Sequence, residues 1–218
     1  MYKLLGVFLL VISVSANAGL LKVVIAYGTG DVPVNSSIDV DADFVALSVT
    51  ITADAKMPAE RAKLINKLQN IINSKASQAT NIDFQQGVIS LSPREKSSFS
   101  ISRSYGRNSE SKFYILAKLD DSKDIYSATQ EIYNFISQIE IPEDTNLRLG
   151  NTSLALASPE QYRSQLLNKI KAEINSTKEV LGTEYKVSIS GIENPVIVRQ
   201  KNDKQVTVFI DYQIQLNQ

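Results

Sequence analysis

Residues 154–182 read LALASPEQYRSQLLNKIKAEINSTKEVLG, the end of a predicted strand followed by a helix with clear start and stop signals. Ser158 is a typical N-cap residue, Pro159 suits the first helical position, and Gln161 follows the cap as in a capping box. Gly182 is a typical C-terminal stop. Between these signals apolar residues recur every three or four positions, at Tyr162, Leu166, Leu167, Ile170 and Ile174. The spacing predicts an amphipathic helix that joins two parts of the fold.

The region before this helix alternates between strand and helix patterns. Residues 44–52 alternate apolar and polar side chains, and residues 58–74 repeat apolar ones at helical spacing, with Arg61 expected outside. Further strands are predicted at residues 82–91, 99–105, 112–119 and 147–157, with a helix capped by Asp121 or Ser122 before the last strand. Two right-handed crossovers in this order produce a four-stranded antiparallel sheet with both helices on one face. We therefore predict an α+β fold in which residues 43–156 form a ferredoxin-like plait (strand-helix-strand-strand-helix-strand).

The two ends of the chain supply the remaining elements. Strands are predicted at residues 20–26, 185–189, 196–199 and 205–216, the last with strict alternation from Val206 onward. We predict that residues 19–42 and 157–218 together form a second, discontinuous α+β subdomain. The helix face of Tyr162, Leu167, Ile170 and Ile174 should then cover a sheet made by both chain ends.

The N-terminus has the pattern of a secretory signal peptide. Lys3 precedes an apolar run at residues 4–14, and the small residues Ala16 and Ala18 stand before Gly19. The run is well short of the roughly 20 residues needed to span a bilayer. We therefore predict a signal peptide at residues 1–18 that is cleaved after Ala18, a periplasmic location, and no permanent membrane anchor.

Composition narrows the classes of function. The chain has no Cys and no His, which excludes thiol nucleophiles, Cys/His zinc sites and Ser-His-Asp triads. Its 23 basic and 23 acidic residues balance, and it has no basic block. Because affinity for nucleic acids comes mainly from cationic contacts with phosphates, a nucleic-acid partner is not expected. No cofactor, metal or catalytic residue is predicted.

Two short motifs in the N-terminal region resemble ligand loops. Gly28 and Gly30 resemble a phosphate loop, but the third glycine and the following helix are missing, so a turn is favoured. The series Asp39, Asp41 and Asp43 resembles the start of a calcium loop. Its sixth and twelfth positions are Phe and Thr instead of Gly and Glu, which favours a polar turn before a strand.

Three further features could support chemistry or binding. Ser109 and Lys112 have the Ser-x-x-Lys spacing, yet they fall in a predicted hairpin turn without the partner motifs. An acidic stretch contains Glu140, Glu143 and Asp144. It could supply paired carboxylates for glycoside hydrolysis, although a solvated loop is favoured. Four aromatic residues could form a stacking platform for sugars or bases, although packing across strands is favoured. They are Phe99, Tyr105, Phe113 and Tyr114.

Four segments resemble, in order, those of the SIMPL-domain family of exported bacterial proteins. They are the Gly28/Gly30 segment, Asp43-Phe-Val-Ala-Leu, Pro58-Ala-Glu-Arg-Ala62 and Ala157-Ser-Pro-Glu-Gln-Tyr-Arg163. The chain departs from the family at Ala42, where Pro is usual, and in a long helix that is poorer in Ala. The resemblance implies a divergent member with a two-part α+β fold and a link to the cell envelope and stress tolerance. It supplies no catalytic residues.

Two hypotheses of function follow from these observations. The first is a non-enzymatic binding or assembly module of the cell envelope, which forms a homo-oligomer or binds an envelope protein through strand edges or the long helix. The alternative is a carboxylate-based hydrolase acting on an envelope polymer. The lack of catalytic residue types favours the first.

Overall fold

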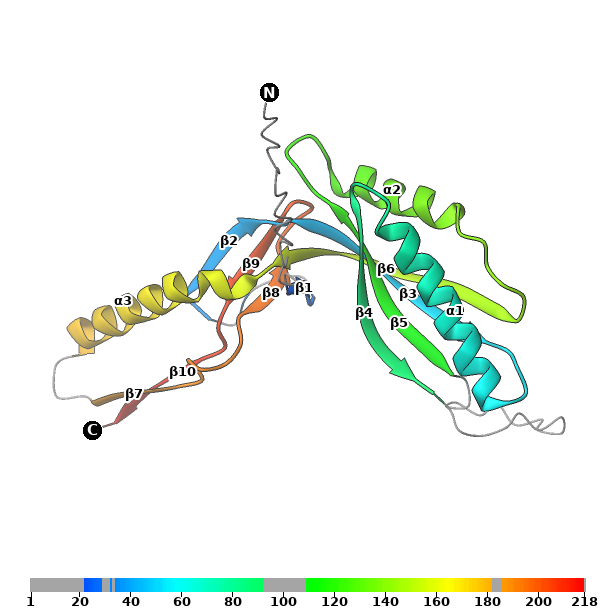
Figure 1. The fold of residues 1–218 in the computed structure, drawn as a ribbon. Coiled ribbons are helices and arrows are strands. Elements are labelled where there is room, and N and C mark those ends of the chain that lie inside the picture. Colours follow the sequence, from blue (N-terminus) through cyan, green and yellow to red (C-terminus); the bar gives the residue numbers. More distant parts are fainter. Residues whose placement is uncertain (1–21, 29–31, 33, 92–108, 182–185, 218) are drawn as a thin grey trace, which may run out of the picture.

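The computed structural model describes residues 22–28, 32, 34–91, 109–181 and 186–217. Within these residues the fold is mixed α+β, with a curled five-stranded antiparallel sheet, a three-stranded sheet, a two-stranded ribbon and three α-helices (Figure 1). The predicted signal peptide and its cleavage site at Ala16, Ala18 and Gly19 lie outside the described residues, as does the predicted strand at residues 99–105.

The five-stranded sheet has the order β1-β6-β3-β5-β4, and every neighbouring pair is antiparallel. Its strands are β1 Val23–Ile25, β3 Phe44–Ala53, β4 Ile82–Ser90, β5 Glu110–Lys118 and β6 Thr145–Ala157. The predicted strand at residues 44–52 is therefore confirmed as β3. It lies in the middle of the sheet, where its alternating residues are buried on both faces.

Helices α1 (Pro58–Ala76) and α2 (Ile125–Ser137) pack against the same face of this sheet. Ile65 and Leu68 of α1 and Ile132 of α2 belong to one core cluster with Val45 and Leu47 of β3. The opposite face of the sheet has a smaller cluster of buried residues, with Phe44, Ala46, Leu116 and Ala155. Both helices therefore cover the same face of the sheet.

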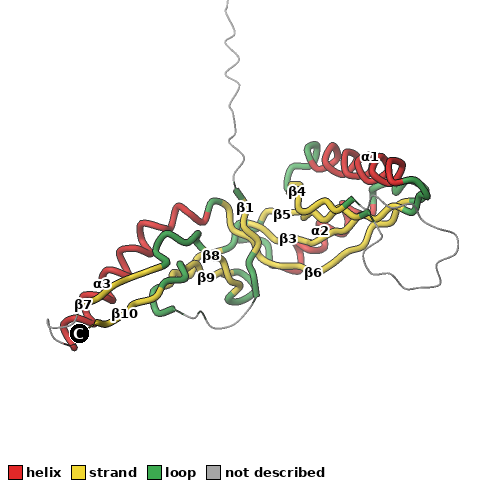
Figure 2. Tube along the Cα trace, turned by 90° about the horizontal axis from the view of Figure 1, so that it is seen from below, coloured by secondary structure: helices red, strands yellow, loops and turns green. Residues whose placement is uncertain are grey.

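The other half of the molecule contains the remaining strands and the long helix. Strands β2 (Ser37–Asp41), β9 (Gln205–Phe209) and β8 (Ile197–Gln200) form the three-stranded sheet, and β7 (Lys186–Ser190) pairs with β10 (Gln213–Asn217). A 3₁₀ turn, η1 (Pro159–Tyr162), leads into α3 (Arg163–Leu181). Figures 1 and 2 show α3 running outward with the β7–β10 ribbon, away from α1 and α2.

Helix α3 contacts segments from both ends of the chain. Leu166 is buried in the main core, Ile170 is buried one turn further along the helix, and Tyr162 and Leu167 are partly buried against the core. The Lys169 ammonium donates to the Ser37 carbonyl of β2 (2.7 Å), and β2 is paired with β9.

The first strand lies in a different place from the one predicted. β1 was expected in the C-terminal half, yet it pairs with the end of β6, where Val23 is opposite Ala157. β3 occupies one edge of β6, and the other edge is available to β1, so that Ala155 has Phe44 on one side and Ile25 on the other. The N–H of Tyr27 then donates to the Val198 carbonyl of β8 (2.9 Å), so the segment after β1 connects the two halves.

The start of the long helix also differs from the prediction. Ser158 has left-handed backbone angles (φ 48°, ψ 54°) and its side chain makes no capping bond. Its N–H instead donates to the Lys22 carbonyl beside β1 (2.9 Å). The Gln161 amide donates to the Ala157 carbonyl (3.4 Å). The prediction of a capping box is therefore wrong, because the hydrogen bond with the N-terminal segment determines the conformation of Ser158. Gly182 lies outside the described residues.

The predicted strand at residues 205–216 is two strands. β9 pairs with β2 and β8, whereas β10 pairs with β7, and residues 210–212 separate them. The Asp211 carbonyl accepts a bond from the Asn194 side-chain amide (2.8 Å), which holds the break against the β7–β8 loop. Ile210 and Tyr212 remain buried, so the apolar alternation continues through the break and conceals it.

Two details of α1 and α2 correct the sequence expectations. Arg61, which was expected outside, is fully buried. Its guanidinium donates to the Ala55 and Lys56 carbonyls (2.9 Å each) and to the Ser109 hydroxyl (3.3 Å), and these bonds compensate for the loss of water. Helix α2 begins after Asp124, whose carboxylate accepts from the Ser127 N–H (2.7 Å); neither Asp121 nor Ser122 is its cap.

Candidate functional site

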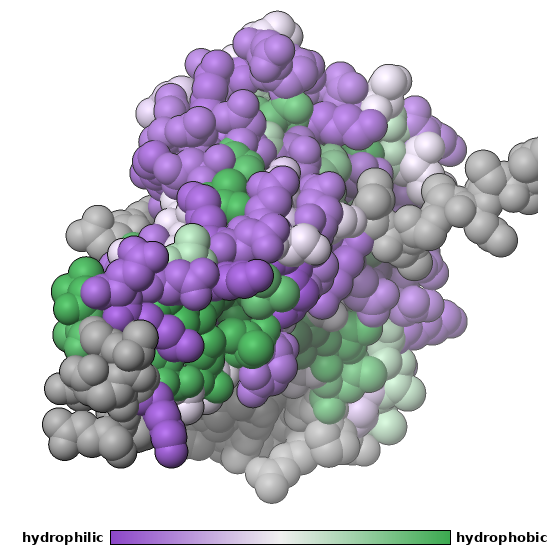
Figure 3. Space-filling model, turned by 90° about the vertical axis from the view of Figure 1, so that its left-hand side faces the viewer, coloured by the Kyte–Doolittle hydropathy of each residue, from purple (hydrophilic) through white to green (hydrophobic). Residues whose placement is uncertain are grey.

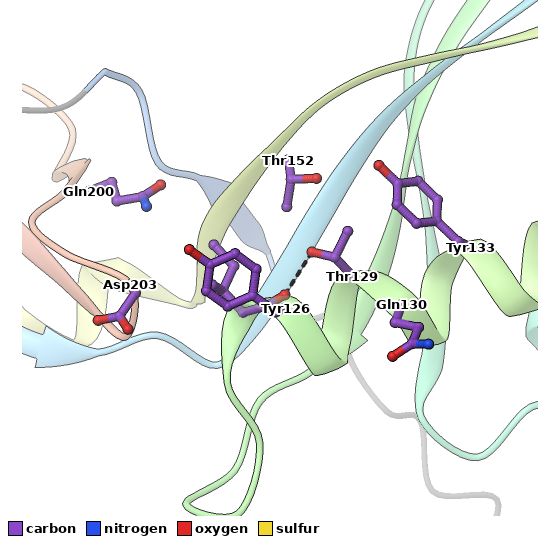
Figure 4. Close-up of a pocket in the computed structure, with 8 residues that line it drawn as sticks. Tyr126, Thr129, Gln130, Tyr133, Thr152, Gln200 and Asp203 are labelled. Carbon is purple, nitrogen blue, oxygen red and sulfur yellow. Dashed lines mark hydrogen bonds between the residues drawn. The ribbon is translucent and has the colours of Figure 1, made fainter.

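A groove opens at the junction of the two halves, between α2, β6 and the turn from β8 to β9 (Figure 4). Its volume is about 480 Å³. The residues that line it are Ile125, Tyr126, Thr129, Gln130, Tyr133, Thr152, Gln200 and Asp203. We call it the α2 groove. Small-molecule sites commonly lie at such junctions and have similar volumes.

Helix α2 supplies one wall and presents two tyrosine rings to solvent. Its apolar stripe of Ala128, Ile132 and Phe135 packs on the sheet, which leaves Tyr126 and Tyr133 beside it. Their exposed fractions are 77% and 46%. Because they are two helical turns apart, they lie on the same side of the helix, about 10 Å from each other along its axis.

The first turn of α2 is held by its own side chains. The Asp124 carboxylate accepts from the Ser127 N–H, and hydrogen bonds from Ser127 lower the pKa of Asp124 below its ordinary value. The Thr129 hydroxyl donates to the Ile125 carbonyl (2.7 Å). These bonds fix the helix end that carries Tyr126.

The opposite wall comes from the other half of the molecule. Gln200, at the end of β8, accepts from the Leu154 N–H of β6 (3.3 Å) and donates to the Asn202 carbonyl (3.1 Å). The Asn202 side-chain oxygen accepts from the N–H groups of Lys204 (2.9 Å) and Gln205 (2.7 Å). These bonds order the turn that carries Asp203. Figure 4 shows Tyr126 at the end of α2 nearer Gln200 and Asp203, with Tyr133 further along the helix.

The lining provides groups for stacking and hydrogen bonding. Among the described residues that line the groove, Asp203 is the one carboxylate, and none is Lys or Arg. A glycosidase of the usual kind needs two carboxylates across the scissile bond. The described residues also contain no cluster of three or more side chains suited to hold a metal ion.

A second, shallower hollow of about 710 Å³ follows the outer face of α1. Its lining includes Lys63, Lys67 and Lys75, with Asn66 and Asn70 between them. The Lys75 ammonium donates to the Gln138 carbonyl after α2. The hollow is formed along a single helix and its end, so opposed walls do not enclose a ligand there.

The Ser-x-x-Lys pair is not assembled for catalysis. Ser109 immediately precedes β5, is buried, and accepts the bond from Arg61. Lys112 lies within β5 and is exposed, and its ammonium is 3.5 Å from the Glu110 carboxylate. Positions three apart on a strand point to opposite faces. The predicted hairpin turn at this motif is therefore also wrong.

The other acidic and glycine candidates are dispersed. Glu140, Glu143 and Asp144 are exposed in the loop between α2 and β6, as favoured from the sequence. Gly28, after β1, has a positive φ of 71°, and Gly30 lies outside the described residues.

The aspartate series forms structural contacts. Asp39 accepts from Thr207 (2.7 Å) and from the Lys201 ammonium (2.6 Å), and these hydrogen bonds lower its pKa. Asp41 accepts from Gln205 (3.2 Å). Asp43 accepts from the Ala157 N–H (2.7 Å), which fixes β3 to the end of β6. The first two lie within β2 and the third follows it, so the predicted polar turn is a strand.

Of the four aromatic candidates, the two among the described residues pack within the fold, as favoured from the sequence. Phe113 is fully buried, with its ring centroid 5.0 Å from that of Phe84. Tyr114 is partly buried in the smaller core cluster. Phe99 and Tyr105 lie outside the described residues.

The sequence patterns did not predict the residues that line the α2 groove. Tyr126 and Tyr133 stand seven positions apart, outside the apolar stripe of their helix. A repeated aromatic on the polar side of an amphipathic helix was the available signal. Gln200 and Asp203 carry no such signal in the sequence, because their position beside α2 depends on how the two halves of the molecule pack together.

Comparisons with known proteins do not assign this chain to a family. No protein-family model and no curated protein matches it. A crystal structure of an uncharacterized conserved protein from Listeria innocua is 7% identical, over 82% of this chain and 92% of that one, with a TM-score of 0.17.

Proposed function

We propose that this protein is a non-enzymatic binding module of the bacterial cell envelope. The observation that carries the proposal is the α2 groove, whose walls offer exposed rings, amides and hydroxyls and a single carboxylate. Such a set can hold and orient a ligand but lacks the paired groups of acid-base hydrolysis. The hydrolase alternative gains no support from the groove.

We also propose export to the periplasm and membership, as a divergent member, of the SIMPL-domain family with its link to stress tolerance. The signal pattern at residues 1–18 supports export. Among the described residues, no helix is both long and apolar enough to cross a membrane. The family segment at residues 157–163 contains Glu160 and Arg163. Arg163 donates hydrogen bonds to the Glu160 carboxylate and to the Asn194 carbonyl, which gives this segment a structural role.

For the architecture, we propose a ferredoxin-like plait at residues 43–156 and a second α+β unit from residues 19–42 and 157–218. The antiparallel order β6-β3-β5-β4 and the common core of α1 and α2 support the plait. The pairing of β2 with β9 supports the second unit. β1 connects the two units, since it pairs with β6.

A homo-oligomer or an envelope protein partner is proposed at the far end of the molecule. The β7–β10 ribbon has two strands, and a lone pair of strands is only marginally stable without further cover. Val180 and Leu181 at the end of α3 are exposed nearby. Figure 3 looks onto this end of the molecule and shows apolar surface among polar residues. Light scattering at high protein concentration tests this part, and a strict monomer would count against self-association.

Two measurements test export and the binding site. Cell fractionation followed by N-terminal sequencing should find a periplasmic chain that starts at Gly19.

A ¹H–¹⁵N NMR screen of soluble envelope compounds should find at least one compound that shifts the signals of Tyr126, Tyr133 and Gln200. A screen in which every binder shifts signals elsewhere would overturn the groove as the functional site.

A further inference from the structure

We propose that the α2 groove binds a short chain of N-acetylated sugars, with sugar rings packed on Tyr126 and Tyr133. The inference rests on the proposed binding function and names the chemical class of its ligand. It is carried by the exposed rings, by the amide-rich lining and by the charge of the groove.

The two rings provide separate platforms on one side of α2. Tyr126 and Tyr133 are 77% and 46% exposed, although each could bury a large apolar area. A sugar ring has an apolar C–H face and a polar edge, so it can cover an aromatic ring while its hydroxyls stay hydrogen-bonded. Because the platforms are about 10 Å apart along the helix, an extended oligosaccharide can contact both.

The polar groups around the rings fit an acetamido substituent. Gln130 and Gln200 each carry an amide with two donor hydrogens and two acceptor lone pairs. Gln200 uses one of each on Asn202 and Leu154, which fixes its orientation and leaves one donor and one acceptor. An N-acetyl group offers one N–H and one carbonyl, so it can pair with such an amide. Ile125 supplies apolar surface for the acetyl methyl.

The charge of the lining selects against anionic ligands. Asp203 can accept bonds from sugar hydroxyls, and no described lining residue is a cation. A phosphate or carboxylate polymer would meet a like charge at Asp203 without a compensating partner in the lining. Neutral N-acetylated sugars satisfy both the donors and the acceptors.

The test is a calorimetric titration of the chain without residues 1–18, which retains every described element. The probe is chitotetraose, an oligomer of β-1,4-linked N-acetylglucosamine, and the comparison is cellotetraose, which has the same linkage without acetamido groups. We expect chitotetraose to bind and to shift the NMR signals of the groove, with cellotetraose at least about tenfold weaker.

Substitutions locate the site. Tyr126→Ala and Tyr133→Ala should each weaken the binding of chitotetraose about tenfold, or about 1.4 kcal/mol, because each removes an aromatic ring on which a sugar ring packs. Tyr133→Phe keeps the ring and should stay close to wild type. The matched control is Tyr27→Ala, which removes a tyrosine that is 83% exposed and does not line the groove. It should leave binding unchanged. Thermal unfolding of each variant verifies that it is folded.

Three outcomes would overturn the inference. The first is that another compound shifts the groove signals while chitotetraose does not bind, in which case the proposed binding function survives. The second is equal binding of cellotetraose, and the third is binding that both alanine variants retain. If no compound shifts the groove signals, the proposed binding site fails as well.

Discussion

The Tyr212 hydroxyl donates a hydrogen bond to the Glu173 carboxylate of α3. The same carboxylate accepts from Ser36 (2.7 Å) and from the Asn35 amide (3.0 Å). Asn35 and Ser36 precede β2, and Tyr212 lies between β9 and β10. One partly buried acid therefore holds the long helix to both ends of the chain.

Acid should weaken this contact. Burial alone raises the pKa of Glu173, but hydrogen bonds from Tyr212, Asn35 and Ser36 bring it below the ordinary 4.5. A lowered pKa stabilises the fold above pH 4.5, and the contribution is lost as the pH falls through the folded value. Glu173→Gln should cost about 1–2 kcal/mol at neutral pH and remove this acid-dependent loss. Urea unfolding at neutral and acidic pH measures both effects.

The matched control for that experiment is Glu179→Gln, on the same helix but exposed. It should leave the unfolding free energy and its pH profile near wild type. Equal acid profiles for wild type and Glu173→Gln would mean that the carboxylate contributes nothing to folding.

Alkaline conditions test the other partner. Burial, followed by the hydrogen bond to Glu173, raises the pKa of Tyr212 above 10.0. The stability linked to this hydroxyl is therefore complete below pH 10.0 and is lost as the pH rises through the folded value. Tyr212→Phe should unfold more easily than wild type at neutral pH, and the difference should shrink in strong alkali. A constant difference across that range would contradict the assignment.

Gly191 should not tolerate a side chain. Its φ is +83°, and a Cβ would lie 2.6 Å from the Asp211 carbonyl oxygen. Gly191→Ala should lower the unfolding free energy by at least about 2 kcal/mol, because strain and a clash add together. Gly28→Ala is the control, since φ is +71° but nothing lies within 4 Å of the added carbon. It should cost about 1 kcal/mol. Equal losses in thermal unfolding would exclude the clash.

Arg163 should be sensitive even to replacement by lysine. Its guanidinium pairs with Glu160 (2.6 Å) and donates to the Ile192 (2.9 Å) and Asn194 (2.7 Å) carbonyls. Glu160 also accepts from the Val196 N–H (2.9 Å). A lysine cannot reproduce this fork, so Arg163→Lys should cost about 1–2 kcal/mol in urea unfolding.

The control is Arg148→Lys, an exposed position on β6 that should be close to neutral. If both variants unfold at the same urea concentration, the bonds of Arg163 to the β7–β8 loop do not stabilise the fold.

Ser158 distinguishes the observed turn from the predicted cap. A true N-cap would lose about 1 kcal/mol on replacement by alanine and only a few tenths with glycine. The left-handed backbone of Ser158 instead favours glycine, and there is no side-chain capping bond to lose. Ser158→Gly should unfold at the same temperature as wild type or higher. A clearly lower unfolding temperature for Ser158→Gly would contradict the left-handed conformation at this position.

The sequence predicted elements better than it predicted their neighbours. Val45, Leu47, Val49 and Ile51 alternate along β3 because they share the face that packs against the helices, and that signal is local. The break at residues 210–212 is not local, because Ile210 and Tyr212 stay buried on either side of a change of partner strand. Ser158 has the composition of a cap, yet pairing between β1 and β6 decides its conformation.

The candidate site was less predictable for the same reason. Periodicity identified Ile132 and Phe135 as the buried stripe of α2 but was silent on the residues beside it. Tyr126 and Tyr133 become the wall of a groove because Gln200 and Asp203 approach from a distant segment. Arg61 likewise looked like a surface residue, and its partners, the Ala55 and Lys56 carbonyls and the Ser109 hydroxyl, come together only in the fold.

The length of β6 has a geometric consequence. Thr152 forms part of the groove, and only a few residues later the same strand pairs with β1 and passes through η1 into α3. Thr152 in the groove wall and the first residues of α3 therefore belong to one continuous stretch of backbone, so this strand contributes to the geometry of both.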